Sequence, residues 1–142
     1  MADLEKILAQ ADANQAQALE RLYAFLRIES ISTDPAFASE CVRAAHWLRD
    51  ELSSLGFSAT CHETPGHPMV TAHSSAPDAQ SSSHLLFYGH YDVQPVDPLE
   101  LWHKPPFEPA LEETENGPVI RARGAADDKG QLMTFVEACR AW

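Results

Sequence analysis

Two short stretches of this sequence carry residue types that could bind a metal ion or move a proton. In the stretch GHYD, His90 and Asp92 stand two positions apart after an apolar run. In an extended segment, residues i and i+2 point to the same side, so these two side chains can converge. In the stretch GAADDKG, Asp127 and Asp128 are adjacent and flanked by glycines. Zinc accepts carboxylate oxygen together with histidine nitrogen, so the two stretches are candidates for a metal site.

The pair His90 and Asp92 allows three interpretations. The imidazole could bind a metal through one nitrogen while the carboxylate orients it through the other, an arrangement that metal-binding histidines usually need. The two residues could instead be two members of a nucleophilic triad. The plainest interpretation is a histidine at the end of a strand that is hydrogen-bonded to an aspartate. The pair alone does not decide between them.

The pair Asp127 and Asp128 also has a structural explanation. The N-terminus of a helix stabilises negative charge, and capping could account for one of the two carboxylates. Capping does not explain the glycine-flanked turn. In open α/β sheets, ligands bind beyond the carboxyl ends of the strands. If both stretches open on the same edge of a sheet, one carboxylate could bridge two metal ions, as two-metal hydrolases require.

Other chemistries have little support in this sequence. No serine stands in a GxSxG motif, no cysteine lies in a motif with a histidine, and there is no GxGxxG or phosphate-binding loop. The three cysteines, an odd number without CxxC spacing, are expected to be reduced thiols. The remaining histidines lack a partner at metal-ligand spacing and are expected to be structural or solvated: His46, His62, His67, His73, His84 and His103.

The elements that must position these residues show helical and strand patterns in turn. Apolar residues at i, i+3 and i+4 spacing predict helices over residues 2–28 and 36–55, and Gly56 stands where a C-terminal cap belongs. Shorter apolar or alternating runs predict three strands, at 57–63, 68–73 and 84–89. The last of them is apolar throughout, as in a sheet that is covered on both faces. His90 therefore follows the end of a predicted strand.

Residues 91–118 interrupt this pattern. Six of the ten prolines lie in this segment, a density that excludes a helix or a central strand. Trp102 and Phe107 favour an ordered, packed loop, and Asn116-Gly117 is typical of a hairpin turn. The elements predicted next are a strand at 119–122 and a helix from Gln131 onward. Together the elements predict an α/β fold, with helices around a mixed, mostly parallel sheet.

Composition limits the class of protein. The 142 residues suit one domain, and a hydrophobic content of 44% is enough for a packed core. A net charge of −11 repels phosphate backbones and argues against nucleic-acid binding. No apolar run reaches membrane-spanning length and the N-terminus lacks a signal-peptide pattern, so we expect a soluble, cytoplasmic protein without membrane contacts. FVEACRAW ends inside a helical pattern, which predicts a fragment of a longer chain.

Three motifs in a fixed order carry a resemblance to a known family. YGHYDVQP, LWHKPPFEP and IRARGAADDKGQ together resemble the zinc-dependent exopeptidase and deacylase family. This family includes carnosinase-type dipeptidases, carboxypeptidase G, aminoacylase, acetylornithine deacetylase and succinyl-diaminopimelate desuccinylase. HYDVQP and PPFEP look most similar to the bacterial dipeptidase branch, and RIESISTDP resembles the start of the family's catalytic domain. Ala122 departs from the pattern, because many relatives have a glycine there.

The resemblance implies a role for each matching residue. His90 matches a histidine ligand of one metal ion, Asp92 matches the active-site aspartate that orients this histidine, and Asp127 matches the carboxylate that bridges two ions. A cis peptide bond between Asp127 and Asp128 is implied as well. The family implies a three-layer helix–sheet–helix fold and hydrolysis of the amide bond of a small peptide by a metal-activated water. The two divalent ions are expected to be zinc, with cobalt or manganese as alternatives.

The resemblance also implies that much of the site lies elsewhere. In the family, the general-base glutamate, the further metal ligands and a lid domain that often forms dimers all follow the bridging aspartate. Residues 1–142 are therefore expected to be the N-terminal part of the catalytic domain, inactive in isolation, with a homodimer only in the full-length protein. Two alternatives are a non-catalytic binding module derived from a peptidase, and a serine-type hydrolase that uses His90 and Asp92 with a nucleophile that the sequence does not reveal.

Overall fold

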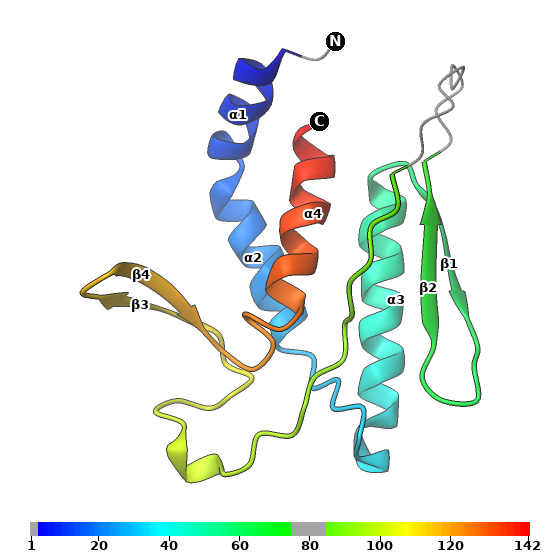
Figure 1. The fold of residues 1–142 in the computed structure, drawn as a ribbon, viewed down its shortest axis with the longest axis vertical. Coiled ribbons are helices and arrows are strands. Elements are labelled where there is room, and N and C mark those ends of the chain that lie inside the picture. Colours follow the sequence, from blue (N-terminus) through cyan, green and yellow to red (C-terminus); the bar gives the residue numbers. More distant parts are fainter. Residues whose placement is uncertain (1–2, 75–84) are drawn as a thin grey trace.

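The computed structural model describes residues 3–74 and 85–142. Within these residues, four α-helices form the body of the molecule and two strand hairpins stand on opposite sides of it (Figure 1). The helices are α1 Leu4–Ala13, α2 Gln15–Leu26, α3 Ala38–Ser54 and α4 Lys129–Ala141. The strands are β1 Ser58–His62, β2 Met69–His73, β3 Ala110–Thr114 and β4 Gly117–Arg121. Short 3-10 turns span Pro35–Phe37 and Leu99–Leu101.

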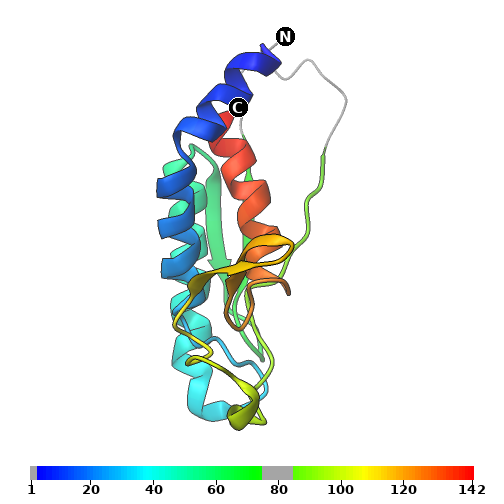
Figure 2. The same cartoon turned by 90° about the vertical axis from the view of Figure 1, so that its left-hand side faces the viewer.

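The N-terminal helical pattern forms two helices, not the single predicted one. α1 begins after Asp3, whose carboxylate accepts a hydrogen bond from the Glu5 backbone N–H at 3.2 Å. It ends at Ala13, Asn14 separates it from α2, and the helical axis bends where α2 begins (Figure 2). Asparagine disfavours a helix interior because its side chain competes for backbone hydrogen bonds. α2 buries Phe25 and Leu26 in its last turn, which fixes the point where the chain leaves the helix.

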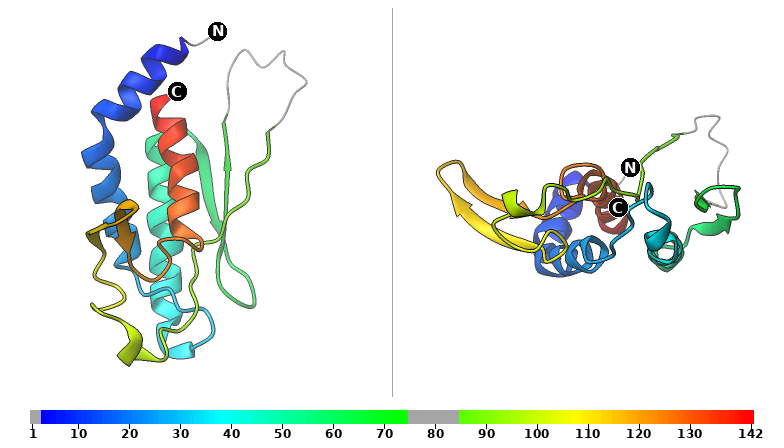
Figure 3. Two further views of the ribbon diagram at one scale, coloured as in Figure 1. Left: turned by 60° about the vertical axis from the view of Figure 1, so that its left-hand side comes forward. Right: turned by 90° about the horizontal axis from the view of Figure 1, so that it is seen from below.

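The predicted second helix and the first two predicted strands are confirmed. α3 continues from the 3-10 turn at Pro35–Phe37. Gly56 has a φ of +88°, a conformation that favours glycine, and it follows the end of the helix as predicted. β1 and β2 pair antiparallel, with Thr60 opposite Thr71, and lie along α3 (Figure 3).

A hydrophobic core joins α2, α3 and α4. Its buried members come from these helices and from the segment after α2: Phe25, Ile28, Ala44, Leu48, Leu132, Met133 and Val136. Phe25 also stacks on Trp47, with ring centroids 4.4 Å apart. Removing a large apolar side chain from water contributes about 1.5–3 kcal/mol. The core therefore holds the end of α2 and the start of α4, which both lie next to the candidate site, against α3.

Residues 85–89 do not form the predicted strand ladder. The segment has no strand assignment, and Leu86 and Tyr88 are 92% and 83% exposed. A strand needs a neighbour to pair with its backbone N–H and C=O groups, and the two sheets of the described residues do not include this segment. The described residues as a whole form two small antiparallel sheets and one isolated parallel bridge between Ile31 and Val93, in place of the expected mostly parallel sheet. His84, the first residue of the predicted strand, lies outside the described residues.

An ordered loop and a hairpin occupy much of the proline-rich segment 91–118. The Trp102 indole N–H donates to the Val96 carbonyl oxygen at 2.9 Å, and the Arg123 guanidinium lies 5.2 Å from the centroid of the same ring. The predicted turn joins β3 to β4 in an antiparallel hairpin, with Glu115 and Asn116 between the strands and Gly117, at a φ of +101°, as the first residue of β4. The sequence gives no signal for β3, because ALEET is rich in glutamate, which strands disfavour. In the described part of the chain, no helix combines the length and the apolar character needed to cross a membrane.

Candidate active site

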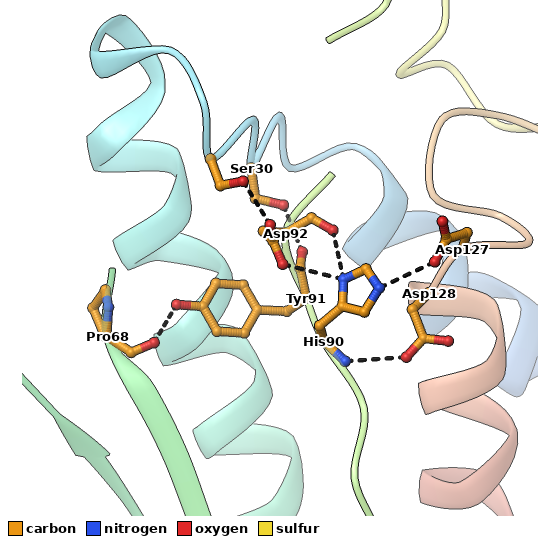
Figure 4. Close-up of polar contacts among 8 residues, drawn as sticks. Ser30, Pro68, His90, Tyr91, Asp92, Asp127 and Asp128 are labelled. Carbon is orange, nitrogen blue, oxygen red and sulfur yellow. Dashed lines mark hydrogen bonds and ion pairs between the residues drawn. The ribbon is translucent and has the colours of Figure 1, made fainter. Parts of the chain in front are cut away.

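His90 and Asp92 converge, as their spacing predicts. His90 Nδ1 lies 3.1 Å from Asp92 Oδ1 and 3.1 Å from the Asp92 carbonyl oxygen (Figure 4). A hydrogen on Nδ1 therefore donates to the aspartate. Because the two ring nitrogens point in different directions, Nε2 remains directed away from Asp92 and toward the turn before α4.

The turn before α4 brings both of its aspartates to His90. Asp127 Oδ1 lies 3.0 Å from His90 Nε2, and Asp128 Oδ2 accepts a hydrogen bond from the His90 backbone N–H at 3.0 Å. A Cβ atom on Gly89 would lie 3.2 Å from Asp128 Oδ2, so glycine gives the two segments room to approach. The peptide bond between Asp127 and Asp128 is cis, as the family resemblance implies. The two candidate stretches of the sequence thus meet at one place.

Two glycines shape the turn that carries Asp127. Gly124 has a φ of +84°, and a Cβ atom there would lie 2.9 Å from Val93 Cγ1. A Cβ atom on Gly130 would lie only 1.9 Å from the carbonyl oxygen of Ala125. Any other residue would push the turn away from the segment that follows His90 or open the turn itself, so the glycines flanking the acidic pair serve its geometry.

Each ring nitrogen of His90 faces a carboxylate. Burial lowers the pKa of His90, but the hydrogen bond to Asp127 and the charge of Asp92 outweigh burial, so the net pKa lies above the usual 6.5. A neutral imidazole has one N–H and can donate to only one of the two carboxylates. A second proton on Nε2 satisfies Asp127, and a divalent cation between Nε2 and Asp127 would do the same. The donor set therefore suits a metal ion.

The described residues supply only part of a metal site. His90 and Asp127 offer two donor atoms, whereas a catalytic zinc ion takes three protein ligands and a water. Within residues 3–74 and 85–142, no group of three or more histidine, cysteine or acidic residues could hold a metal ion. The Asp127 side chain is 83% exposed, so it is accessible to further ligands from outside these residues.

Ser32 and His67, for which the sequence predicted no catalytic role, support the Asp92 carboxylate through a chain of hydrogen bonds. The Ser32 hydroxyl donates to Asp92 Oδ2 at 2.6 Å, and His67 Nε2 lies 2.8 Å from the Ser32 carbonyl oxygen, which can only accept. His67 thus has a structural role, as predicted, and so does His62, which contacts Thr71 Oγ1. Ser32 could not be identified from spacing, because it lies 60 residues from Asp92 in the sequence. The stretch RIESISTDP, which contributes to the family resemblance, was the only pointer to it.

Lys129 ties the turn to the end of α2. Its side chain is fully buried, and its Nζ donates to the carbonyl oxygens of Phe25 at 3.1 Å and Ile28 at 2.6 Å. Burial lowers the pKa of Lys129 to about 7. This lysine follows the acidic pair directly, so its anchoring also fixes the start of α4 relative to α2.

No nucleophile accompanies His90 in the described part of the chain. The ring contacts there are to Asp92 and Asp127, not to a serine or a cysteine. Cys41, Cys61 and Cys139 are free thiols, as expected, and burial raises the pKa of each of them. A protonated thiol is a poor nucleophile. The serine-type hydrolase therefore gains no support from the structure.

Comparisons with known proteins identify relatives over most of the chain. Residues 86–142 match the model of peptidase family M20/M25/M40. The Cys-Gly metallodipeptidase DUG1 of Saccharomyces cerevisiae is 27% identical over 98% of this chain and 31% of its own length. The succinyl-diaminopimelate desuccinylase of Paraburkholderia xenovorans is 38% identical over 64% of this chain and 23% of its own length.

The fold agrees with these sequence matches. The crystal structure of human carnosine dipeptidase 1 superposes with a TM-score of 0.83 at 29% identity, over 98% of this chain and 31% of that chain. This chain therefore spans less than a third of the length of these relatives. The resemblance predicted from the three motifs is confirmed: residues 86–142 match the model of peptidase family M20/M25/M40, and the chain is similar in sequence to a Cys-Gly metallodipeptidase and a succinyl-diaminopimelate desuccinylase and in fold to carnosine dipeptidase 1.

Proposed function

We propose that this chain supplies one part of the active site of a binuclear metal-dependent dipeptidase. The substrates would be dipeptides or related N-acyl amino acids, cleaved at the amide bond. The observation that carries the proposal is the meeting of His90 Nε2 and Asp127 Oδ1 at 3.0 Å, with the other ring nitrogen held by Asp92. The similarity to a Cys-Gly metallodipeptidase and to carnosine dipeptidase 1 supports this substrate class.

Each of the three residues has a distinct task in this proposal. His90 would hold one divalent ion through Nε2, and Asp127 would be the carboxylate that this ion shares with a second one. Asp92 would keep the hydrogen on Nδ1, which directs the lone pair of Nε2 toward the metal. When bound, two zinc ions would supply polarisation of the scissile carbonyl group and a lowered pKa for a shared water. Cobalt and manganese offer the same chemistry.

We further propose that residues 1–142 are the N-terminal part of the catalytic domain. The exposed apolar segment 85–89 would then become a strand of the three-layer, mostly parallel sheet by pairing with strands from elsewhere in the protein. By itself the 142-residue chain would hydrolyse no dipeptide, because His90 and Asp127 do not complete a catalytic zinc site and, in the family that the chain resembles, the general-base glutamate follows the bridging aspartate. The complete protein would act in the cytoplasm on small peptides, as a possible homodimer, without nucleic-acid or membrane partners.

A non-catalytic binding module derived from a peptidase is the second candidate. The observation that favours it is the lack of a third metal ligand within residues 3–74 and 85–142. Such a module would retain the fold but have no hydrolytic activity in any form of the protein. The two candidates therefore differ in what the gene encodes after Trp142 and in the activity of the complete product.

The first experiment is to sequence the source DNA through the codon after Trp142 and to express the complete reading frame. We expect the product to hydrolyse the Cys-Gly dipeptide, to lose activity with a chelator and to regain it with zinc. His90→Ala and Asp127→Ala should each lower kcat/KM at least about 100-fold, because losing a ligand costs more than losing its outer partner. His62→Ala, an exposed histidine on β1, is the matched control and should retain activity.

Three results would count against the proposal. Hydrolysis that is insensitive to chelator, or full activity in His90→Ala, would show that a metal held by these residues does not perform the reaction. A stop codon directly after Trp142, together with a stable product that binds no zinc, would favour the non-catalytic module instead.

A further inference from the structure

We infer that Ser32 is a positioning residue of this site, which fixes the Asp92 carboxylate and through it the orientation of the His90 ring. The inference rests on the proposed function, because its consequence is measured at the proposed metal site. Asp92 Oδ2 accepts from the Ser32 hydroxyl at 2.6 Å, and Asp92 Oδ1 lies 3.1 Å from His90 Nδ1. Each oxygen of the Asp92 carboxylate thus has a separate partner: Ser32 for Oδ2 and His90 for Oδ1.

Ser32 can orient Asp92 because Ser32 itself is held on two sides. Its backbone N–H donates to the Val93 carbonyl oxygen at 3.3 Å, and its own carbonyl oxygen accepts from His67 Nε2 at 2.8 Å. His67 belongs to the loop between β1 and β2, so the support comes from a separate element. The hydroxyl group of Ser32 therefore starts from a fixed backbone position.

The segment around Ser32 is paired with the segment around Asp92. Val93 N–H donates to the Ser30 carbonyl oxygen at 2.9 Å, and the Ser30 hydroxyl donates to the Tyr91 carbonyl oxygen at 2.7 Å (Figure 4). Ser30 is fully buried, and Ile31 forms the parallel bridge to Val93. The two segments therefore move as one unit, and the contact between Ser32 and Asp92 is built into it.

The chain just before Ser30 also contacts Lys129, which follows the turn that carries Asp127. Lys129 Nζ donates to the carbonyl oxygens of Phe25 and Ile28, which precede Ser30 in the same stretch of chain. The segment that carries His90 is held through Ser32, and the turn that carries Asp127 is held through Lys129. The stretch from Phe25 to Ser32 is thus a common support that sets the distance between the two metal-binding side chains.

The hydroxyl group of Ser32 has a specific task in this arrangement. The torsion that rotates a carboxylate is broad, so a single contact to His90 would leave Asp92 free to turn. The hydroxyl holds Oδ2 and keeps Oδ1 aimed at Nδ1. Loss of an outer partner of a metal-binding histidine typically lowers metal affinity 10- to 100-fold. Ser32 acts on His90 only through Asp92, which remains in place, so we expect the lower end of this range, about 10-fold, from losing the Ser32 hydroxyl group.

The test compares Ser32→Ala, Ser32→Thr and the control Ser54→Ala in the protein expressed from its complete reading frame. Ser54 lies at the exposed end of α3, where its hydroxyl donates to the Glu51 carbonyl oxygen. Cobalt(II) affinity is measured by competition with a chelator, and the 15Nδ1 chemical shift of His90 is measured without metal at one fixed pH. Ser32→Ala should bind cobalt(II) about 10-fold more weakly and shift the Nδ1 resonance. Ser32→Thr keeps a hydroxyl and should recover most of both, while Ser54→Ala should change neither.

The two readouts separate this inference from the proposed function. If the unmutated protein binds no cobalt(II), the proposed function fails, and the Nδ1 shift of Ser32→Ala still decides the role of Ser32. If Ser32→Ala lowers the free energy of unfolding but leaves both the Nδ1 shift and the metal affinity unchanged, Ser32 is only structural and the inference is overturned. If the unmutated protein binds cobalt(II), an unchanged metal affinity in Ser32→Ala overturns the inference as well.

Discussion

Replacing Gly130 by alanine tests whether the turn that carries Asp127 is as tightly closed as the structure shows. Gly130 is the second residue of α4, where helix propensity alone favours alanine over glycine by about 1 kcal/mol. Helix propensity therefore predicts a more stable protein. The structure predicts the opposite, because a Cβ atom at this position would lie 1.9 Å from the Ala125 carbonyl oxygen.

The size of the effect follows from this distance. Cβ atoms essentially never lie within 3.0 Å of another heavy atom, so the two groups must separate by 3.0 − 1.9, or about 1.1 Å. The obstacle is a backbone carbonyl group, which cannot rotate away as a side chain can. Overpacking costs typically 1–3 kcal/mol, and the rigid obstacle places Gly130→Ala near the upper value of about 3 kcal/mol. After the gain of about 1 kcal/mol in propensity, we expect a net destabilisation of about 2 kcal/mol.

Urea unfolding of the 142-residue chain, followed by circular dichroism, measures this change. Gly66→Ala is the matched control, because the nearest atom to its Cβ would be Thr64 Oγ1 at an ordinary 3.8 Å. We expect Gly66→Ala to change the free energy of unfolding by less than about 1 kcal/mol. If Gly130→Ala were as stable as the unmutated chain or more stable, the tight turn and the placement of Asp127 derived from it would be refuted.

Two further predictions concern buried charge. Burial lowers the pKa of Lys129 from 10.5 to about 7, so between these values the unfolded chain holds more protons and stability rises with pH. The free energy of unfolding, measured by urea titration, should rise by about 1.5 kcal/mol from pH 7 to 8.5, and Lys129→Met should lack this rise. An equal rise in the variant would show that Lys129 does not cause it. Glu137 accepts two hydrogen bonds from Arg21, at 2.7 and 2.6 Å. Glu137→Gln should therefore lower the free energy of unfolding by about 1 kcal/mol. Glu40→Gln, which loses its pair with Arg43, whose side chain is 57% exposed, should cost less than about 0.5 kcal/mol, and equal losses would show that burial does not strengthen the Glu137–Arg21 pair.

The sequence by itself determined the features that depend on neighbouring residues. The i, i+2 spacing of His90 and Asp92 is enough to bring them together, because an extended backbone places such side chains on one side. Gly56 follows the end of α3, and Gly117 follows the turn between β3 and β4, because glycine adopts the positive φ that both positions require at little cost. The motif around Asp127 carried the family resemblance and, with it, the cis peptide bond.

Only the tertiary structure decided which distant segments meet. The contact between His90 and Asp127 joins residues 37 positions apart, and that between Ser32 and Asp92 joins residues 60 positions apart. No periodicity or turn signal reports such distances, because those signals act over a few residues. The segment 85–89 shows that a local pattern can also predict an element that does not form. Its apolar residues predict a strand, but a β-ladder needs a neighbouring strand, and the described residues provide none. Local patterns therefore set the elements, and packing around α2, α3 and α4 set the site.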